Sequence, residues 1–214
     1  MEIEFKFKVT KEQIEQAFKK AEIGDIGPHK VRAEDTSIKN DLYYYKEGSK
    51  DPLFRIRSET WRYSPYEPED ILKAFFAGWF ESKEKINTTT YITHKVKKVE
   101  EGVEVNHEFE IKIDNSDLDT LNNFVKFYEL QNNFRKTKVC CGFKIGDFHL
   151  EFVNFYGHYF AEIEYTKNEL DVSTACFAME EICKYLGLDC SKKINESWDK
   201  VLKEINNTTK AGKD

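Results

Sequence analysis

The sequence has no long apolar run and no strong excess of charge of one sign. No segment of the 214-residue chain is apolar enough to span a bilayer, and its first residues do not read as a secretory leader, so we expect a cytoplasmic protein that does not bind membranes. The formal net charge of −6 is mild and gives no general attraction to nucleic acid. Internal repeats and low-complexity linkers are also missing, and the length fits a single domain.

Cysteine is scarce, and its spacing does not fit a metal site. Two of the five cysteines, Cys140 and Cys141, are adjacent, while Cys176, Cys183 and Cys190 follow one another at intervals of seven residues. Neither arrangement has the spacing of a zinc site. Cys176 and Cys183 would share one helix face, so we interpret them as small core residues in a reducing compartment.

Charge is what the sequence has in quantity. Asp, Glu, Lys and Arg make up 34% of the residues, with both signs interleaved, which is high for a compact domain. In the opening segment, alternation puts Glu2, Glu4 and Lys6 on one face of a strand and the apolar Ile3 and Phe5 on the other. This pattern is typical of any half-buried antiparallel strand with its charges in water. Two carboxylates and an ammonium on one face can also hold a divalent cation beside a phosphate.

The same alternation recurs in later segments, and most of the charged faces carry a single sign. These faces are Arg55 and Arg57; Thr93, Lys95 and Lys97; Glu108 and Glu110; Lys136 and Lys138; and Glu162 and Glu164. Repeated in enough strands, the pattern predicts a barrel with a charged interior. Acidic faces on some strands and basic faces on others suit a polyphosphate bound together with a divalent metal. We interpret Lys8, Lys97 and Lys98 as solvent-exposed lysines.

Hydrophobic periodicity predicts the secondary structure. Strands are predicted at residues 1–9, 30–45, 53–57, 91–99, 103–113, 133–145, 148–154 and 158–166. Helices are predicted at residues 10–22, 115–131, 173–186 and 194–205. Thr10 and Gln13 form a capping box at the start of the first helix, and Gly187 ends the third.

An aromatic-rich segment, residues 58–90, interrupts this pattern. It reads as irregular apart from a helix at 68–80, where apolar pairs such as Phe75 and Phe76 recur at helical spacing. We favour a helix whose apolar face packs on the barrel. The alternative is a lid that stacks on a nucleotide base at the barrel mouth.

The charged segments resemble the motifs of the CYTH superfamily, also called triphosphate tunnel metalloenzymes. The opening EIEFK at 2–6 matches the ExExK signature of that family. The later motifs follow in the family's order and cover nearly the whole chain: DLYY at 41–44, LFRIR at 53–57, THK at 93–95, EFE at 108–110, KTK at 136–138, FAEIE at 160–164 and SW at 197–198.

A few positions depart from the family pattern. Asn106 stands where an arginine is usual, and Tyr45 stands where an aspartate follows the tyrosine pair. Lys138 replaces an arginine, which keeps the charge but loses bidentate phosphate geometry. Glu151 stands where an aspartate is usual on the penultimate strand. These changes leave the metal-binding motifs intact and bear on the class of substrate.

The resemblance implies an α+β fold with an eight-stranded antiparallel β-barrel that forms a tunnel, and with helices packed outside. We expect one domain at 1–205 that contains the inserted segment 58–90, followed by a frayed tail at 206–214. The resemblance also implies Mg²⁺ or Mn²⁺, held by carboxylates: Glu2, Glu4, Glu108, Glu110, Glu162 and Glu164. The triphosphate would be bound by basic residues: Lys6, Arg55, Arg57, Lys95, Lys136 and Lys138.

The predicted function is hydrolysis of a nucleotide or other triphosphate compound by a metal-dependent enzyme. The predicted catalytic residues are Glu4, Lys6, Lys95 and Glu110, with Glu4 and Glu110 both candidates to orient the attacking water. The candidate substrates are nucleotides, tripolyphosphate, thiamine triphosphate and 5′-triphosphate RNA, and the protein would be a monomer or homodimer. Two alternatives stay open: a class IV-type adenylate cyclase, and a catalytically weak binder of polyphosphate or triphosphorylated nucleotide.

Overall fold

The computed structural model describes residues 2–22, 24–63, 68–78, 85–100, 103–114, 118–167, 169–198, 200–201 and 204–205. In chain order its strands and helices are β1 (Glu2–Lys8), α1 (Lys11–Ala21), β2 (Val31–Tyr45), β3 (Phe54–Tyr63), α2 (Pro68–Ala77), β4 (Lys85–Glu100), β5 (Val103–Ile113), α3 (Leu118–Phe127), β6 (Gln131–Ile145), β7 (Phe148–Phe155), β8 (His158–Tyr165) and α4 (Val172–Leu186).

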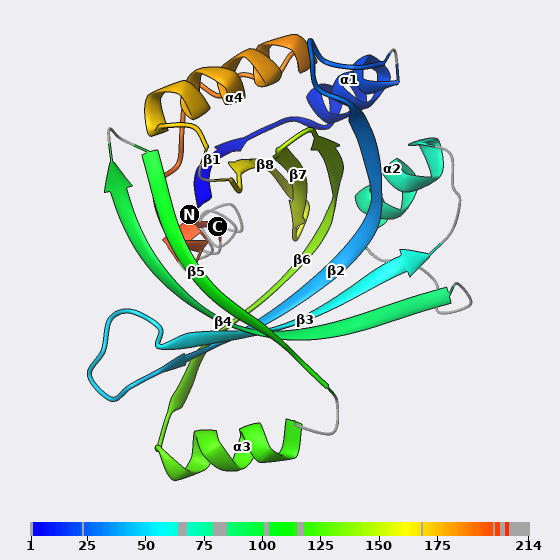
Figure 1. The fold of residues 1–214 in the computed structure, drawn as a ribbon. Helices are drawn as coiled ribbons and strands as arrows, with labels where there is room; N and C mark the ends of the chain where they lie inside the picture. Colours follow the sequence, from blue (N-terminus) through cyan, green and yellow to red (C-terminus); the bar gives the residue numbers. More distant parts are fainter. Residues whose placement is uncertain are drawn as a thin grey trace, which may run out of the picture.

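The strands close into one barrel in the order β1-β5-β4-β3-β2-β6-β7-β8 (Figure 1). All neighbouring pairs are antiparallel. Closure pairs each strand on both sides, which satisfies the backbone groups that an open edge would leave to solvent. The predicted α+β fold with an eight-stranded antiparallel barrel is confirmed.

The helices cover part of the outside of the barrel. Helices α1 and α4 lie together over one side, and α2 lies beside β2 (Figure 1). The apolar face of β1 packs under them: Ile3 and Phe5 belong to the same buried cluster as Phe18 of α1 and Met179 of α4. Because the apolar face of β1 is buried outward under these helices, its alternating charged face points into the barrel.

Local sequence signals hold at the helix ends. The capping box of α1 is present, with Thr10 N donating to Gln13 Oε1 at 2.8 Å and Gln13 N donating to Thr10 Oγ1 at 3.2 Å. Helix α4 ends at Gly187, whose φ of 80° lies in the left-handed region that glycine adopts without strain. Trp198, Lys200, Val201, Glu204 and Ile205 are helical, as predicted, but residues 194–197 are not, so the predicted start of the last helix at 194 is wrong. The predicted tail at 206–214 lies outside the described residues.

The segment 58–90 is more regular than predicted. Strand β3 continues to Tyr63 and β4 begins at Lys85, and the two strands pair through this stretch, with Trp61 opposite Asn87. The alternation is weak there, and only the pairing with the neighbouring strand reveals the extended conformation. Helix α2 is present, and Phe75, fully buried, packs near Tyr159 with ring centroids 6.0 Å apart. The packing interpretation is therefore confirmed for α2, while residues 79–84 lie outside the described residues.

Within the described residues, no helix combines the length and apolarity that crossing a membrane requires.

Candidate functional site in the barrel interior

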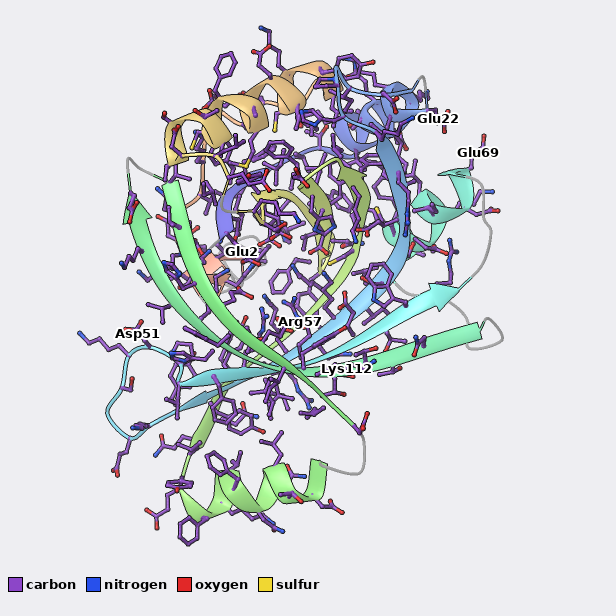
Figure 2. All side chains as sticks on the ribbon, viewed as in Figure 1. Glu2, Glu22, Asp51, Arg57, Glu69 and Lys112 are labelled. Atoms are coloured by element: carbon purple, nitrogen blue, oxygen red, sulfur yellow. The ribbon has the colours of Figure 1, made fainter. Side chains whose placement is uncertain are left out.

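Charged side chains from every strand of the barrel meet in its interior. Figure 2 shows Glu2 and Arg57 within the outline of the barrel, whereas Glu22 and Glu69 lie at its periphery. Strand register brings acidic and basic positions face to face: Lys6 pairs with Glu162. The inner face of the barrel is thus charged through strand parity, as the sequence predicted.

A cluster of carboxylates surrounds Lys95. Its Nζ lies 3.0 Å from Glu108 Oε1, 3.3 Å from Glu4 Oε2 and 3.7 Å from Glu104 Oε1. Burial acts to lower the pKa of Lys95, but the carboxylates of Glu4 and Glu108 outweigh it and raise that pKa above its ordinary value. The ammonium therefore stays charged and holds the cluster together.

Two carboxyl groups of this cluster, Glu2 and Glu4, have raised pKa values. Burial, followed by the nearby Glu108 and Glu164, raises the pKa of Glu2 to about 8. Burial also raises the pKa of Glu4, against the attraction of Lys95. Carboxyl groups that resist ionisation in this way need a further cation to be charged at neutral pH.

This donor set fits a hard divalent cation. Carboxylate oxygens are the ligands that Mg²⁺ and Mn²⁺ prefer, and Glu2, Glu4, Glu108 and Glu164 are the residues that would hold such an ion. Within the described residues, three or more acidic, histidine or cysteine side chains do not already converge as a ready ligand set. Lys95 lies among the carboxylates, so metal binding would require its ammonium to withdraw from Glu4 and Glu108.

The other two predicted metal ligands face the tunnel with different partners. Glu162 accepts hydrogen bonds from Lys138 at 2.6 Å and from the indole of Trp198 at 2.8 Å. Glu110 accepts a hydrogen bond from Thr93 at 2.8 Å, and its Oε2 lies 3.7 Å from Arg55. Glu162 and Glu110 therefore each have hydrogen-bonding or basic partners outside the cluster around Lys95.

A basic cluster is built around Asp41. The fully buried Asp41 accepts hydrogen bonds from Arg57 Nε at 2.7 Å and Arg57 Nη2 at 3.0 Å, and Lys136 Nζ lies 3.1 Å away. Burial acts to raise the pKa of Asp41, but Arg57 and Lys136 hold it well below its ordinary value. The carboxylate is thus ionised and anchors two of the predicted phosphate-binding residues.

Lys138 and Lys39 form an adjacent network through Glu151. Lys138 Nζ lies 2.8 Å from Glu151 Oε2, and Lys39 is bonded to the other oxygen of the same carboxylate. Lys39 also lies 3.2 Å from Glu59. Glu151 faces the tunnel as the family pattern implied, whereas Lys39 and Glu59 were not singled out in the sequence. Lys39 lies two residues before Asp41, and Glu59 lies two residues after Arg57. This spacing puts each on the same strand face as its neighbour, and it is the signal that could have identified them.

Lys6 is the least compensated cation of the tunnel. Its side chain is buried, with 4% of the residue surface exposed. Across the described ranges, no hydrogen bond or ion pair joins its ammonium to another residue, and its nearest recorded contact is the ring of Trp198, 5.2 Å away. Burial lowers the pKa of Lys6, although Glu4 and Glu162 act in the opposite direction. A buried ammonium without a bonded acid can accept an external anion as its partner.

Two further residues bear on the interior. Lys97 is exposed, as predicted, and it also forms an ion pair with Glu104 and donates to Asn195 O at 3.3 Å. His149 was not singled out in the sequence analysis. Its Nε2 lies 2.6 Å from Glu34 Oε2, and its Nδ1 lies 3.0 Å from Glu164 Oε1. Burial acts to lower the pKa of His149, but these hydrogen bonds raise it to about 10. The exposed Lys8 and Lys98 are as predicted.

Comparison with known proteins finds this architecture among solved structures. No family model matches the sequence, and no curated protein matches it. Solved structures do match. The PH1819 protein of Pyrococcus horikoshii OT3 is similar over 95% of this chain and 99% of its own length, with a TM-score of 0.66 and 17% identity.

Two other structures show the same likeness. A candidate adenylate cyclase from Vibrio parahaemolyticus is similar over 94% of this chain and 97% of its own, with a TM-score of 0.61 and 14% identity. A chain of the Schizosaccharomyces pombe Mediator head module is similar over 90% of this chain and 97% of its own, with a TM-score of 0.54 and 13% identity. The chain has the CYTH-like barrel fold that its motifs predicted. At these identities the likeness concerns the fold.

Proposed function

We propose that this chain is a divalent-metal-dependent triphosphatase that hydrolyses a nucleotide or another triphosphate compound inside the charged barrel. Lys6 is the observation that carries the proposal. It is a buried ammonium without a bonded acid, and it lies between the carboxylate cluster at Glu4 and the basic cluster at Lys136. An anion at Lys6 would find cations on one side and, on the other, carboxylates suited to a metal ion.

The basic residues would bind the phosphate oxygens. Lys6, Lys136 and Lys138 each lie within 6 Å of the Trp198 ring, which brings three ammonium groups close together. Arg55 donates to Thr93 at 3.0 Å through Nη2, while its buried Nε has no recorded hydrogen-bond partner in the described chain. These groups would neutralise the charge that develops on the leaving group.

The acidic residues would hold the cation and position the nucleophile. Glu2, Glu4, Glu108 and Glu164 would bind Mg²⁺ or Mn²⁺, which when bound supplies Lewis-acid stabilisation of phosphate charge. Glu4 and Glu110 are the candidates to orient a water. Thr93 fixes Glu110 through Oε2, and in the described residues Oε1 has no recorded partner, so that oxygen can accept a hydrogen bond from water.

A cyclase is the second candidate. The likeness to the candidate adenylate cyclase of Vibrio parahaemolyticus favours it, since the same phosphate-binding groups could deliver a ribose hydroxyl to the α-phosphate. A binding protein without catalysis is the third candidate, and Lys95 among the carboxylates is the feature that favours it.

A product screen tests these candidates. The protein is incubated with tripolyphosphate, ATP, thiamine triphosphate and 5′-triphosphate RNA, with Mg²⁺ or Mn²⁺. Phosphate release supports the triphosphatase, pyrophosphate with cyclic AMP supports the cyclase, and tight binding without product supports the binder. Lys6→Met removes the ammonium, and Lys8→Met at an exposed position of the same strand is its matched control. Loss of turnover in Lys6→Met alone is expected; equal turnover in both variants contradicts the assignment of Lys6.

A further inference from the structure

The segment after α4 returns to the barrel and covers part of its interior. Ile194 N donates to Lys6 O at 2.6 Å, and Trp198 and Val201 further along the chain are helical. Val201 is 4% exposed and packs in a buried cluster with Phe155 and Phe160. This segment is therefore packed against the barrel, with its own apolar contacts.

The aromatic residues beneath this segment belong to the tunnel face. Phe155 lies four residues after Glu151 on β7, and Phe160 lies two residues before Glu162 on β8. Residues at even spacing share a strand face, so all four point inward. Near the β7–β8 turn the tunnel face changes from charged to apolar. The ring of Trp198 fills this region, with centroids 5.5 Å from Phe155 and 5.2 Å from Phe160.

The same indole borders the phosphate-binding lysines. Its ring centroid lies 5.2 Å from Lys6 Nζ, 5.0 Å from Lys136 Nζ and 5.7 Å from Lys138 Nζ. Its Nε1 donates to Glu162 at 2.8 Å, which fixes the orientation of the ring. An indole face attracts ammonium groups and offers no positive charge to a phosphate. The lysines thus mark the end of the path that a phosphate chain can follow, and Trp198 forms the wall behind them.

We propose that Trp198 closes this end of the tunnel, so that a phosphate chain enters from the opposite mouth and its free terminal phosphate stops against Lys6, Lys136 and Lys138. The proposal rests on the proposed function of the site and adds a class of ligand. Compounds with an unsubstituted terminal phosphate are accepted. Compounds whose phosphate chain carries a nucleoside at both ends are excluded, because the second nucleoside would occupy the volume of the indole and its packed phenylalanines.

Binding of two matched ligands tests the proposal. ATP carries one adenosine on a triphosphate and diadenosine triphosphate carries two, and both affinities are measured by calorimetry in Mg²⁺. The protein should bind ATP at least about tenfold more tightly than diadenosine triphosphate. Trp198→Ala should bring this ratio toward one. The charge difference between the two ligands is the same for every variant. A change in the ratio of affinities therefore reflects the steric effect of the Trp198 side chain and not the charge of the ligands.

Three companion variants distinguish steric exclusion by Trp198 from a role of Trp198 in stability alone. Trp198→Phe keeps a ring and should keep most of the discrimination, although it loses the hydrogen bond to Glu162. Trp198→Leu keeps apolar contact with Phe155 and Phe160, and provides a smaller side chain if Trp198→Ala does not fold. Phe177→Ala, at an exposed position of α4, should leave the ratio unchanged. Melting temperatures identify the folded variants.

Each outcome bears on the proposal. Equal binding of the two ligands by the unmodified protein overturns it, as does full discrimination by a folded Trp198→Ala or Trp198→Leu. Binding of ATP without hydrolysis overturns the triphosphatase, while the ratio of affinities still tests the wall. If neither ATP nor tripolyphosphate binds, the site assignment fails and the proposal fails with it.

Discussion

Arg57 directs its guanidinium fork onto Asp41, with Nε–Oδ1 at 2.7 Å and Nη2–Oδ2 at 3.0 Å. The two residues face each other across the β2–β3 pair. Burial acts to lower the pKa of Arg57, but the Asp41 carboxylate raises it well above its ordinary value. The arginine is thus a fixed cation whose orientation Asp41 determines, and part of its hydrogen-bonding capacity is used inside the protein.

Arg57→Lys tests the importance of this geometry. A lysine keeps the charge but cannot make two parallel hydrogen bonds to Asp41, so we expect a loss of about 1–3 kcal/mol in the free energy of unfolding, measured with urea. Triphosphate affinity should fall nearly as much as in Arg57→Ala. Arg135→Lys, at an exposed position of β6, is the control. Wild-type stability and affinity in Arg57→Lys would mean that charge alone matters at this position.

Glu4→Gln tests the carboxylate cluster. The amide keeps the shape of the side chain but removes a hard oxygen ligand, so metal-dependent turnover should fall by about a hundredfold or more. The fold should persist, because the pKa of Glu4 is already raised by burial and a neutral side chain is tolerated there. Steady-state rates and melting temperatures check both points, with the exposed Glu22→Gln as control. Near-full turnover in Glu4→Gln would remove it from the metal site.

Metal affinity should depend on pH through Glu2. The pKa of Glu2 is raised to about 8 by burial and by Glu108 and Glu164, and a metal ion must displace this proton to use the carboxylate. Affinity for Mg²⁺ should therefore increase between about pH 6 and pH 9 and level off above the pKa. Calorimetric titration at several pH values measures this, and Glu2→Gln should flatten the curve. An affinity that is independent of pH in the unmodified protein would exclude Glu2 as a ligand.

His149 should make the free energy of unfolding fall as the pH rises. Its pKa is raised from 6.5 to about 10 by hydrogen bonds to Glu164 and Glu34, against burial. A raised pKa in the folded state gives stability that is complete below the unfolded value of 6.5 and is lost as the pH rises toward about 10.

Urea unfolding at several pH values across this window measures the effect of His149. His149→Gln removes the titrating group, so its stability should change less across the same pH range. The exposed His158→Gln should follow the unmodified protein. Identical slopes for His149→Gln and the unmodified protein would show that His149 is not protonated in the fold.

Local sequence patterns were enough to predict which residues share a face. Alternation in β1 places Glu2, Glu4 and Lys6 inward, and the capping box of Thr10 and Gln13 starts α1, because both signals act over a few residues and need no partner. The order of charged motifs then predicted the barrel. The segments 58–63 and 85–90 were missed as strands, since their conformation depends on pairing with each other.

Which charges are neighbours depends on how the whole barrel folds. Closure of the barrel brings Lys95 of β4 to Glu4 of β1. The segment after α4 brings Trp198 to Lys6, at the opposite end of the sequence. Strand parity fixes the direction of a side chain, but the distance between two side chains depends on the register and tilt of every strand between them. Those are long-range quantities that no short stretch of sequence contains, and they set the partner of each buried charge.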